Sequence, residues 1–211
     1  MRVASFPVPP FFENTYLVAC PETGRAVAVD PGDGSEALVD AVRASGLTLQ
    51  AILLTHAHLD HITGVHLVKA AFGVPVYLHP ADRVLYDAIL EQGRMFGIQV
   101  QKQPAPDADL RQGDVIEVGR LVWRVHETPG HSPGGVSLEV NEPDGSSSLF
   151  VGDALFAGSI GRTDLPGGDY STLIGSIRRV LFAFADEVPV YAGHGEPTTI
   201  GQERRENPFL R

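Results

Sequence analysis

The strongest constraint on the fold is a turn, residues 56–61, that carries four side chains able to bind a metal ion. The turn reads His-Ala-His-Leu-Asp-His, follows the apolar run Ala51–Leu54 and precedes a helical pattern over Thr63–Ala71. Side chains two positions apart on a chain that leaves a strand face the same side, so His56 and His58 can converge. The aspartate and the last histidine follow where the chain enters the helix, so one short turn can supply two adjacent ions. The alternative is a polar turn whose histidines bind nothing.

Strand-length apolar runs recur along the chain, with helical patterns between some of them. The predicted strands are Tyr16–Ala19, Ala26–Val29, Ala51–Leu54, Val74–Leu78, Val115–Val118, Leu121–Val125, Val136–Val140, Leu149–Val151 and Val188–Tyr191. The predicted helices are Ser35–Ala44 with Ser35 as N-cap, Thr63–Ala71, Ala81–Leu90, and Thr172–Phe182 after Ser171. The predicted long loops are Gln92–Gln112, a polar surface connection, and Gly158–Asp169, which contains four glycines. The irregular order favours mixed sheets covered by helices over a uniform βαβ winding.

Composition limits the class of protein. A chain of 211 residues, 43% apolar and 20% charged, has the size and character of one globular domain spanning residues 1–211. The net charge of −10 disfavours binding to nucleic acid or to an anionic membrane surface. We find no apolar run long enough to span a membrane and no secretory signal at the start, so the expected compartment is the cytoplasm. The single cysteine, Cys20, cannot form an internal disulfide.

Three more metal-binding side chains follow later predicted strands. His131, Asp153 and His194 each come directly after a glycine, where two backbones can approach closely. Taken singly, each has a structural reading, as a hydrogen-bonded histidine or as an aspartate that caps a turn. Their recurrence at strand ends favours one shared site.

The ligand chemistry indicates a catalytic site. Five histidines and two aspartates are nitrogen and oxygen ligands, which suit zinc, iron or manganese and not a thiolate-rich structural site. A carboxylate can bridge two ions, and Asp153 or Asp60 is the candidate bridge. Two ions roughly 3.5–4 Å apart would lower the pKa of a shared water towards neutrality and stabilise an oxyanion. The chain has no G-x-S-x-G motif, and Cys20 lies far upstream, so metal-assisted hydrolysis is the chemistry predicted.

These residues resemble the metallo-β-lactamase fold superfamily. The run 56–61 with His131, Asp153 and His194 carries the resemblance to the superfamily. More narrowly, Thr128–Gly135 and the segment Gly152–Asp164 are similar to the glyoxalase II, or hydroxyacylglutathione hydrolase, group. The resemblance implies an αβ/βα sandwich, an α/β fold of two mixed sheets face to face, with helices on the outer faces and metals at one edge.

The resemblance also assigns roles. It implies a first ion held by His56, His58 and His131, a second held by Asp60, His61 and His194, and a bridge by Asp153. The implied cofactor is a pair of divalent ions, most simply zinc, with iron or manganese as alternatives. The implied reaction is attack of a bridging hydroxide, oriented by Asp60, on the carbonyl of S-2-hydroxyacylglutathione. The partner is then a small-molecule thioester, whereas the oligomeric state, monomer or homodimer, stays open.

Two features depart from the glyoxalase II pattern. The chain stops about 17 residues after His194, where that enzyme continues into a helical region with basic residues for glutathione. In place of a lysine and, two residues on, a tyrosine near the substrate, this sequence has Arg162 and Asp164. Arg162 keeps the cation and can bind a substrate carboxylate in a bidentate fork. The alternative is a salt bridge within the loop.

Other functions fit the same residues. The turn Gly161–Asp164 and the run 55–64 also resemble persulfide dioxygenases, which implies one iron bound by His56, His131 and Asp153. A lactonase is a weaker alternative, and a metal-stabilised binding module without catalysis is a reading from another class.

Four further residues stay outside the predicted ligand set. His66, His79 and His126 are expected to have structural or supporting roles. Asp30, in the turn Asp30-Pro31-Gly32-Asp33, either supports the site from behind the ligands or belongs to an ordinary turn.

Overall fold

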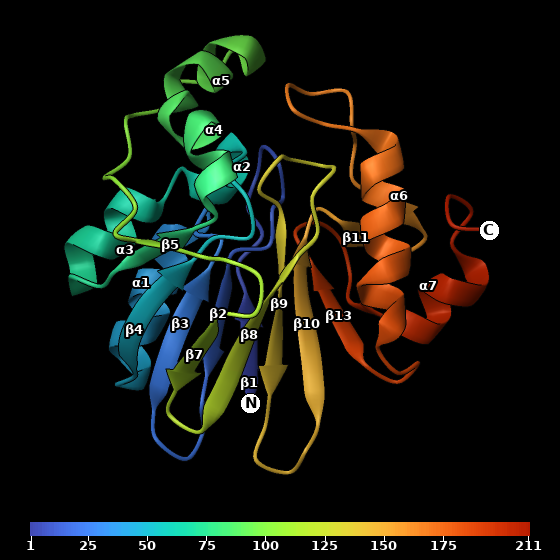
Figure 1. Cartoon of the computed structure of the whole chain (residues 1–211). Helices are drawn as coiled ribbons and strands as arrows, with labels where there is room; N and C mark the ends of the chain where they lie inside the picture. The colour runs from blue at the N-terminus through green and yellow to red at the C-terminus, as the bar shows by residue number, and fades with distance from the viewer.

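The computed structural model describes residues 1–211, and it has four layers. Two six-stranded sheets lie face to face, with helices on both outer faces (Figure 1). This is the α/β sandwich of mixed sheets that the sequence predicts, and the prediction is confirmed. No helix is long and apolar enough to cross a membrane.

The first sheet is formed by the N-terminal half of the chain. Its order is β1 (Arg2–Ser5), β2 (Tyr16–Ala19), β3 (Arg25–Val29), β4 (Thr48–Leu53), β5 (Val76–Leu78) and β6 (Ala108–Asp109). The first three strands are antiparallel, and β3 to β6 are parallel. Helix α1 (Ser35–Ser45) connects β3 to β4, and α2 (Leu59–Ile62) with α3 (Val65–Phe72) connects β4 to β5. The parallel order brings the ends of β3 and β4 to the same edge.

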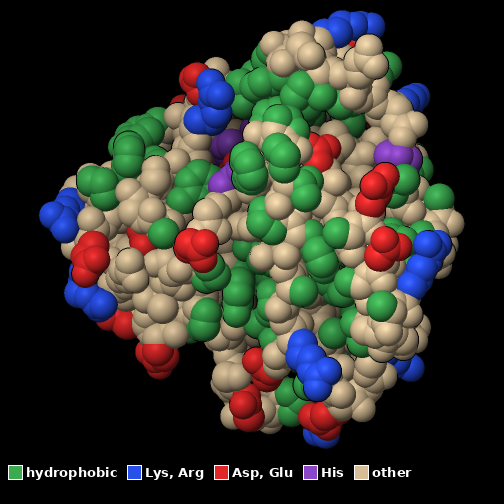
Figure 2. Space-filling view, turned by 180° about the vertical axis from the view of Figure 1, so that it is seen from behind, with side chains coloured by type: hydrophobic (Ala, Val, Ile, Leu, Met, Phe, Trp, Pro, Cys, Tyr) green, Lys and Arg blue, Asp and Glu red, His purple; other side chains and the backbone are tan.

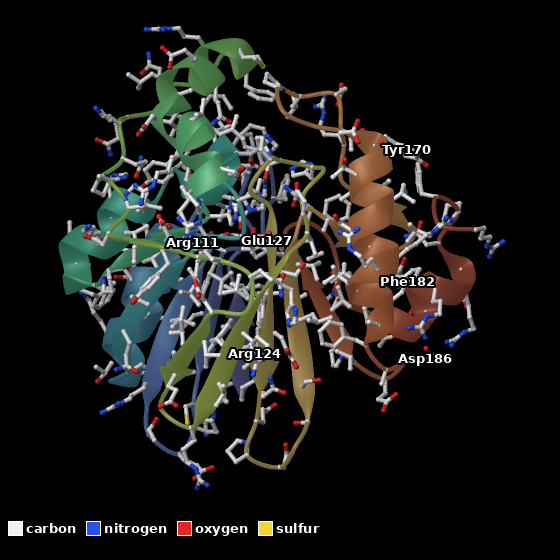
Figure 3. The ribbon with its side chains drawn as sticks, in the orientation of Figure 1. Arg111, Arg124, Glu127, Tyr170, Phe182 and Asp186 are labelled. Atoms are coloured by element: carbon white, nitrogen blue, oxygen red, sulfur yellow. The ribbon has the colours of Figure 1, made fainter.

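The second sheet is formed by the C-terminal half. Its order is β14 (Thr198–Thr199), β13 (Pro189–Ala192), β10 (Ser147–Gly152), β9 (Val136–Asn141), β8 (Leu121–Glu127) and β7 (Val115–Val118). All pairs are antiparallel except β10 with β13. Helices α6 (Tyr170–Arg179) and α7 (Ile200–Glu206) cover the β13 side of this sheet, and no helix lies over Arg124 of β8 (Figure 3). A small hairpin, β11 (Leu155–Phe156) with β12 (Ser159–Ile160), stands apart.

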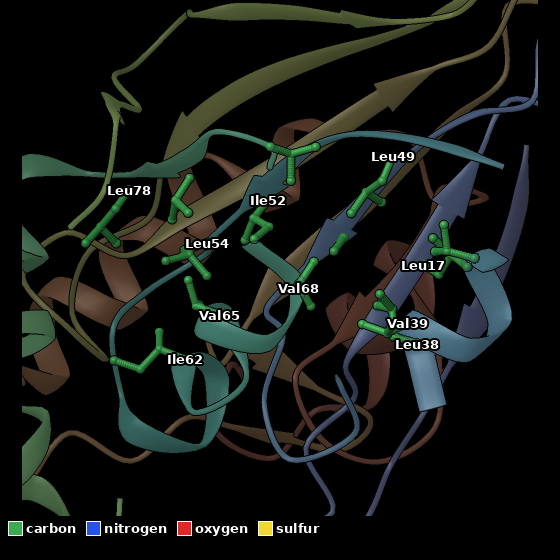
Figure 4. Packing of buried hydrophobic residues seen from close by; sticks show 14 of the residues in the cluster. Leu17, Leu38, Val39, Leu49, Ile52, Leu54, Ile62, Val65, Val68 and Leu78 are labelled. Atoms are coloured by element: carbon green, nitrogen blue, oxygen red, sulfur yellow. The ribbon is translucent and has the colours of Figure 1, made fainter. Parts of the chain in front are cut away.

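Three apolar cores join the layers. One packs α1 and α3 against the first sheet, with Leu38, Val68 and Ile52 among its members (Figure 4). A second lies between the sheets around Trp123, and a third packs α6 against β10 and β13. Central strands therefore contribute to two cores at once. In β3, alanines face the helices and valines face the second sheet, which explains why such strands appear in the sequence as continuous apolar runs.

All nine predicted strands are present, and the boundaries differ at the ends. The largest difference is at β4, which begins at Thr48 and not at Ala51. The sequence prediction missed β1, β6, β11, β12 and β14, which have two to four residues each and lie mostly at sheet edges. Short edge strands carry too few alternating residues to give a sequence signal.

The predicted N-cap of α1 is wrong, and so are the predicted starts of α3, which begins at Val65 and not at Thr63, and of α6. Residue Gly34, not Ser35, is the N-cap of α1, because the Ser35 hydroxyl donates a 2.7 Å hydrogen bond to the Gly32 carbonyl inside the preceding turn. Helix α6 begins at Tyr170, ahead of the predicted Thr172, since the Asp169 carboxylate accepts a 2.7 Å hydrogen bond from the Thr172 amide. A carboxylate at this position satisfies an amide that the helix cannot.

The expected helix Ala81–Leu90 and the surface connection Gln92–Gln112 are partly wrong. The segment forms a 3-10 turn η1 (Pro80–Asp82) and two helices, α4 (Arg83–Asp87) and α5 (Ile89–Phe96). The amide of Gln92 explains the extension to Phe96. It accepts a hydrogen bond from the Leu59 amide and donates to the Ala57 carbonyl, both at 3.0 Å, so this polar residue is buried against the histidine turn.

Candidate metal centre

All seven predicted ligands meet at one edge of the two sheets. His56 and His58 follow β4, Asp60 and His61 lie in α2, and His131, Asp153 and His194 follow β8, β10 and β13, respectively. In the view from behind, histidine side chains are visible near the top of the molecule, next to hydrophobic ones (Figure 2). Ligands separated by up to 138 residues (56 to 194) are thus gathered by the ends of four strands and one short helix.

Three imidazoles form the first group. His131 Nε2 lies 2.8 Å from His58 Nδ1 and 3.2 Å from His56 Nε2. All three side chains are buried. These three ring nitrogens lie within 4.8 Å of one another and match the donor set that the resemblance implies for one ion.

The second group contains one carboxylate and two imidazoles. Asp60 Oδ2 lies 3.2 Å from His194 Nε2 and 3.9 Å from His61 Nε2. His61 is fully buried, whereas the His194 side chain is 29% exposed. This group therefore lies nearer to solvent on its His194 side, and its three ligand atoms also lie close enough to share one ion.

Asp153 lies between the two groups. Its Oδ2 is 3.5 Å from His131 Nε2 and 3.6 Å from His194 Nε2, and its Oδ1 is 3.4 Å from His61 Nε2. One carboxylate therefore faces ligand atoms of both groups, which is the position required of a bridge. Asp60 faces ligand atoms of the second group alone.

Orphaned polar atoms show that the site fits a cation. His61 Nε2 and Asp153 Oδ1 face each other, are buried, and have no hydrogen-bond partner. A buried polar atom without a partner costs about 1–3 kcal/mol, so such atoms are rare in folded proteins. A divalent ion between them would satisfy both, and a donor set of imidazole and carboxylate suits zinc, iron or manganese.

Glycines make room for the ligands, as the sequence predicts. A Cβ at Gly193 would overlap Asp153 Oδ1 and lie 2.6 Å from His61 Cε1. At Gly152 the backbone has a φ of +51°, which favours glycine, and an added Cβ would overlap Thr55 Oγ1 and lie 2.8 Å from Thr55 Cβ. Each glycine lets a strand end reach the histidine turn.

Asp30 supports the second group from behind. Its carboxylate accepts hydrogen bonds from the Thr55 amide (2.7 Å) and hydroxyl (2.6 Å), and its Oδ2 lies 3.1 Å from His61 Nδ1. Of the two readings of the turn that begins at Asp30, the structure favours the supporting one. Because these partners occupy the carboxylate, the cluster of Asp30, His56 and His61 is a hydrogen-bond network and not a third ion site.

Asp82 plays the corresponding part for the first group, and the sequence prediction missed it. Its Oδ2 accepts hydrogen bonds from the Ala57 amide (3.0 Å) and the Ser132 hydroxyl (2.8 Å), and its Oδ1 accepts one from the Gly134 amide. Asp82 is thus bonded to the histidine turn and to the turn after His131. The only signal in the sequence was a carboxylate after His79-Pro80, which looks like an ordinary helix start.

Burial and charge set the protonation states. Burial lowers the pKa of His56 well below its usual value, and it lowers the pKa of His58 to about 3. Burial acts in the same direction on His61, but Asp153 and Asp60 outweigh it and raise the pKa of His61 well above its usual value. Burial would raise the pKa of Asp153, yet His61 outweighs it and keeps that carboxyl ionised. Neutral His56 and His58 and an ionised Asp153 are the forms that bind metals.

The predicted substrate contact, Arg162, is already paired. Its guanidinium binds Asp164 in a fork, Nε to Oδ1 at 2.7 Å and NH2 to Oδ2 at 2.8 Å, and both side chains are more than half exposed. The backbone of Arg162 acts on the site directly, because its carbonyl lies 2.7 Å from His131 Nδ1. The loop salt bridge considered from the sequence is present.

The three histidines left out of the ligand set lie in other networks. His66 Nδ1 lies 2.9 Å from the Thr63 carbonyl, His79 pairs with Glu127, and His126 pairs with Glu139. None belongs to a group that could hold an ion. Their supporting roles agree with the sequence analysis.

Comparison with known proteins places this site in a family context. Residues 8–194 match the model of the metallo-beta-lactamase superfamily. Among curated proteins, the chain is 38% identical over 212 residues to "Hydroxyacylglutathione hydrolase GloC" of Haemophilus influenzae, covering 100% of this chain and 98% of that protein.

Solved structures give the same fold. The chain resembles BLEG-1 B3 metallo-beta-lactamase (39% identity, TM-score 0.89, 99% of both chains covered). It also resembles TTHA1623 in a di-iron-bound form, with 42% identity and a TM-score of 0.87. The match covers 98% of this chain and 100% of that one. ETHE1 from Myxococcus xanthus is 30% identical with a TM-score of 0.80, covering 99% of this chain and 84% of that one.

Proposed function

Because this chain belongs to the metallo-β-lactamase superfamily, we propose that it is a binuclear metal-dependent hydrolase that cleaves a small thioester, with S-2-hydroxyacylglutathione as the leading substrate. The observation that carries the proposal is the position of Asp153 between two complete ligand groups. The partner proposed is the small-molecule thioester alone.

We assign each of the two ligand groups to one ion. His56, His58 and His131 hold one ion, Asp60, His61 and His194 hold the other, and Asp153 bridges. When bound, two divalent ions, most simply zinc, supply hydroxide near neutral pH and polarise the thioester carbonyl. Iron is the main alternative metal, given the di-iron form of the TTHA1623 structure.

Three carboxylates of the site orient the reacting groups. Asp60 accepts a hydrogen bond from the attacking group and fixes its direction. Its side chain lies next to His194, on the side of the second group nearer to solvent, and is 13% exposed, which supports this role. Asp30 and Asp82 keep the ligand turns in place behind the site. Holding the reacting groups in fixed positions lowers the entropic part of the barrier.

The GloC relative supports the thioester substrate. The match covers 98% of that protein, so the likeness to a protein named hydroxyacylglutathione hydrolase extends over nearly its whole length. The absence of the lysine and tyrosine at positions 162 and 164 leaves Arg162 as the proposed contact for an anionic group.

A second candidate is a mononuclear iron persulfide dioxygenase with His56, His131 and Asp153 as ligands. The likeness to ETHE1 favours it. All seven ligand residues fit both reactions, so the likeness to GloC, at 38% identity over 212 residues, is what favours the hydrolase. Oxygen dependence and metal stoichiometry separate the two.

The test is anaerobic hydrolysis of S-lactoylglutathione by the zinc-loaded chain, with a chelated sample and a His58→Ala variant as controls. We expect free thiol to be released by the loaded chain and by neither control. No release above the controls would reject the thioesterase. Oxygen consumption with glutathione persulfide by iron-loaded protein would then establish the dioxygenase.

A further inference from the structure

A fourth buried carboxylate, Glu13, lies behind the second ligand group. We propose that Glu13 is a positioning residue for the ion held by Asp60, His61 and His194, and that it strengthens the binding of that ion and not of the other. The inference rests on the proposed metal centre but not on the substrate.

The side chain of Glu13 faces one histidine. Its Oε1 lies 3.8 Å from His61 Nδ1, on the side of the ring opposite the ligand atom Nε2. Glu13 is only 3% exposed, and Oε1 has no hydrogen-bond partner. The other oxygen, Oε2, accepts a 2.9 Å hydrogen bond from the Thr15 hydroxyl, which fixes the carboxylate in place.

The backbone of Glu13 reaches another ligand of the same group. Glu13 and His194 form an isolated antiparallel bridge, and the next residue, Asn14, donates a 2.7 Å hydrogen bond to the Gly193 carbonyl. The Asn14 side chain also donates to the Ala192 carbonyl at 3.0 Å. One residue therefore contacts His61 with its side chain and His194 with its backbone.

This arrangement makes the two groups unequal. In the first group, His56 Nδ1 faces the Thr55 hydroxyl and His131 Nδ1 faces a backbone carbonyl, both neutral. In the second, His61 Nδ1 faces two carboxylates, Asp30 at 3.1 Å and Glu13 at 3.8 Å. A carboxylate behind an imidazole makes the ring a better donor, and its charge attracts the cation.

Glu13 needs a positive charge on its His61 side. A buried carboxylate oxygen without a hydrogen-bond partner is unfavourable unless a cation lies close to it, and in the metal-free chain His61 is the group that Oε1 faces. Residues that weaken the fold locally are expected at functional sites. The ion that His61 helps to hold would supply the compensating charge, and this explains why the carboxylate lies there.

The test is metal binding to the full chain, measured by competition with a chromophoric chelator. For Glu13→Gln we expect one of the two zinc ions to bind roughly 10–100-fold more weakly, with the other unchanged. Glu22→Gln, at an exposed carboxylate paired with Arg120, is the matched control and should bind both ions as the natural chain does. In a His194→Ala background, which removes the ion of the second group, Glu13→Gln should have no further effect.

A second readout does not depend on affinity. Without metal, Glu13→Gln should unfold at the same temperature as the natural chain or at a higher one, because the amide oxygen can keep the hydrogen bond from Thr15 and Oε1 has no hydrogen bond to lose. Zinc should raise the melting temperature of Glu13→Gln by less than it raises that of the natural chain. A structural role alone predicts a lower melting temperature without metal and the full rise with zinc.

Either of two results would overturn the inference: unchanged affinity for both ions, or equal weakening of both. These outcomes are independent of turnover. If the chain binds two ions but hydrolyses no thioester, the proposed function fails while the role of Glu13 is still decided.

Discussion

The carboxylate of Asp82 accepts a 2.8 Å hydrogen bond from the hydroxyl of Ser132, the residue that follows His131. The same oxygen accepts a hydrogen bond from the amide of Ala57, which lies between His56 and His58. The three ligands of the first group are thus connected through one side chain that is fully buried. The position of these imidazoles depends on a residue that is not itself a ligand.

Replacing Asp82 should destabilise the fold and the first ligand group together. Asp82→Ala leaves three buried donors without an acceptor, and we expect a loss of about 3 kcal/mol or more in the free energy of unfolding. Urea denaturation of the metal-free chain measures this loss. Asp87→Asn, at an exposed carboxylate in α4, should change stability by less than about 0.5 kcal/mol. Equal stability of the Asp82 variant and the natural chain would contradict this account.

His194→Ala separates the two candidate functions. In the binuclear account this variant loses one of two ions, because Asp60, His61 and the bridging Asp153 bind it poorly without His194. In the one-iron account, whose ligands are His56, His131 and Asp153, the variant keeps its full metal content. Metal analysis of the purified variant after dialysis, alongside the natural chain, gives the stoichiometry directly.

Gly193→Ala should disturb the site without a large effect on the fold. Its Cβ would overlap Asp153 Oδ1, so the carboxylate must move away from the bridging position. We expect at least a tenfold fall in kcat, because the oriented ligands are displaced. Gly175→Ala, in α6 with no atom within 4 Å of the added Cβ, is the matched control and should gain roughly 0.5–1 kcal/mol in stability.

The salt bridge between Arg162 and Asp164 should form only while the Asp164 carboxyl is ionised. The hydrogen bond from Arg162 lowers the pKa of that carboxyl to about 2. A depressed acidic pKa means that the pairing is present above the usual value, about 3.9, and is lost as the pH falls through 2. In Arg162→Gln, the carboxyl titration followed by NMR should move up towards the usual value. An unchanged titration would show that Arg162 does not hold Asp164 in solution.

Freeing Arg162 tests its proposed contact with the substrate. Asp164→Asn removes the charge that competes for the guanidinium fork. If Arg162 binds a carboxylate of the thioester, KM should fall and kcat should stay the same, because this contact is made in both ground and transition states. An unchanged KM would assign the pair to the loop alone.

The sequence predicted the parts of the site whose signal is local. The turn 56–61 is dense in ligands, and His131, Asp153 and His194 each follow an apolar run and a glycine. Strands buried on both faces, such as β2 and β3, appear as continuous apolar runs, and all nine predicted strands are present. The resemblance carried by these residues then implied the sandwich, which the fold confirms.

The supporting residues could not be predicted, because their partners are distant in sequence. Asp82 bonds to Ser132, 50 residues away, and Gln92 bonds to Leu59, 33 residues away. Glu13 precedes a buried strand and looks like a surface residue at a strand start. Its position beside His61 depends on how β2 is placed against β3 and α2, which no local pattern encodes.

The most direct test of the central claim is turnover as a function of metal content. The metal-free chain is mixed anaerobically with increasing equivalents of zinc, and hydrolysis of S-lactoylglutathione is followed by the release of free thiol. We predict that activity depends on the second equivalent and reaches its plateau at two ions per chain. A plateau at one equivalent, or no turnover with two ions bound, would contradict the binuclear hydrolase.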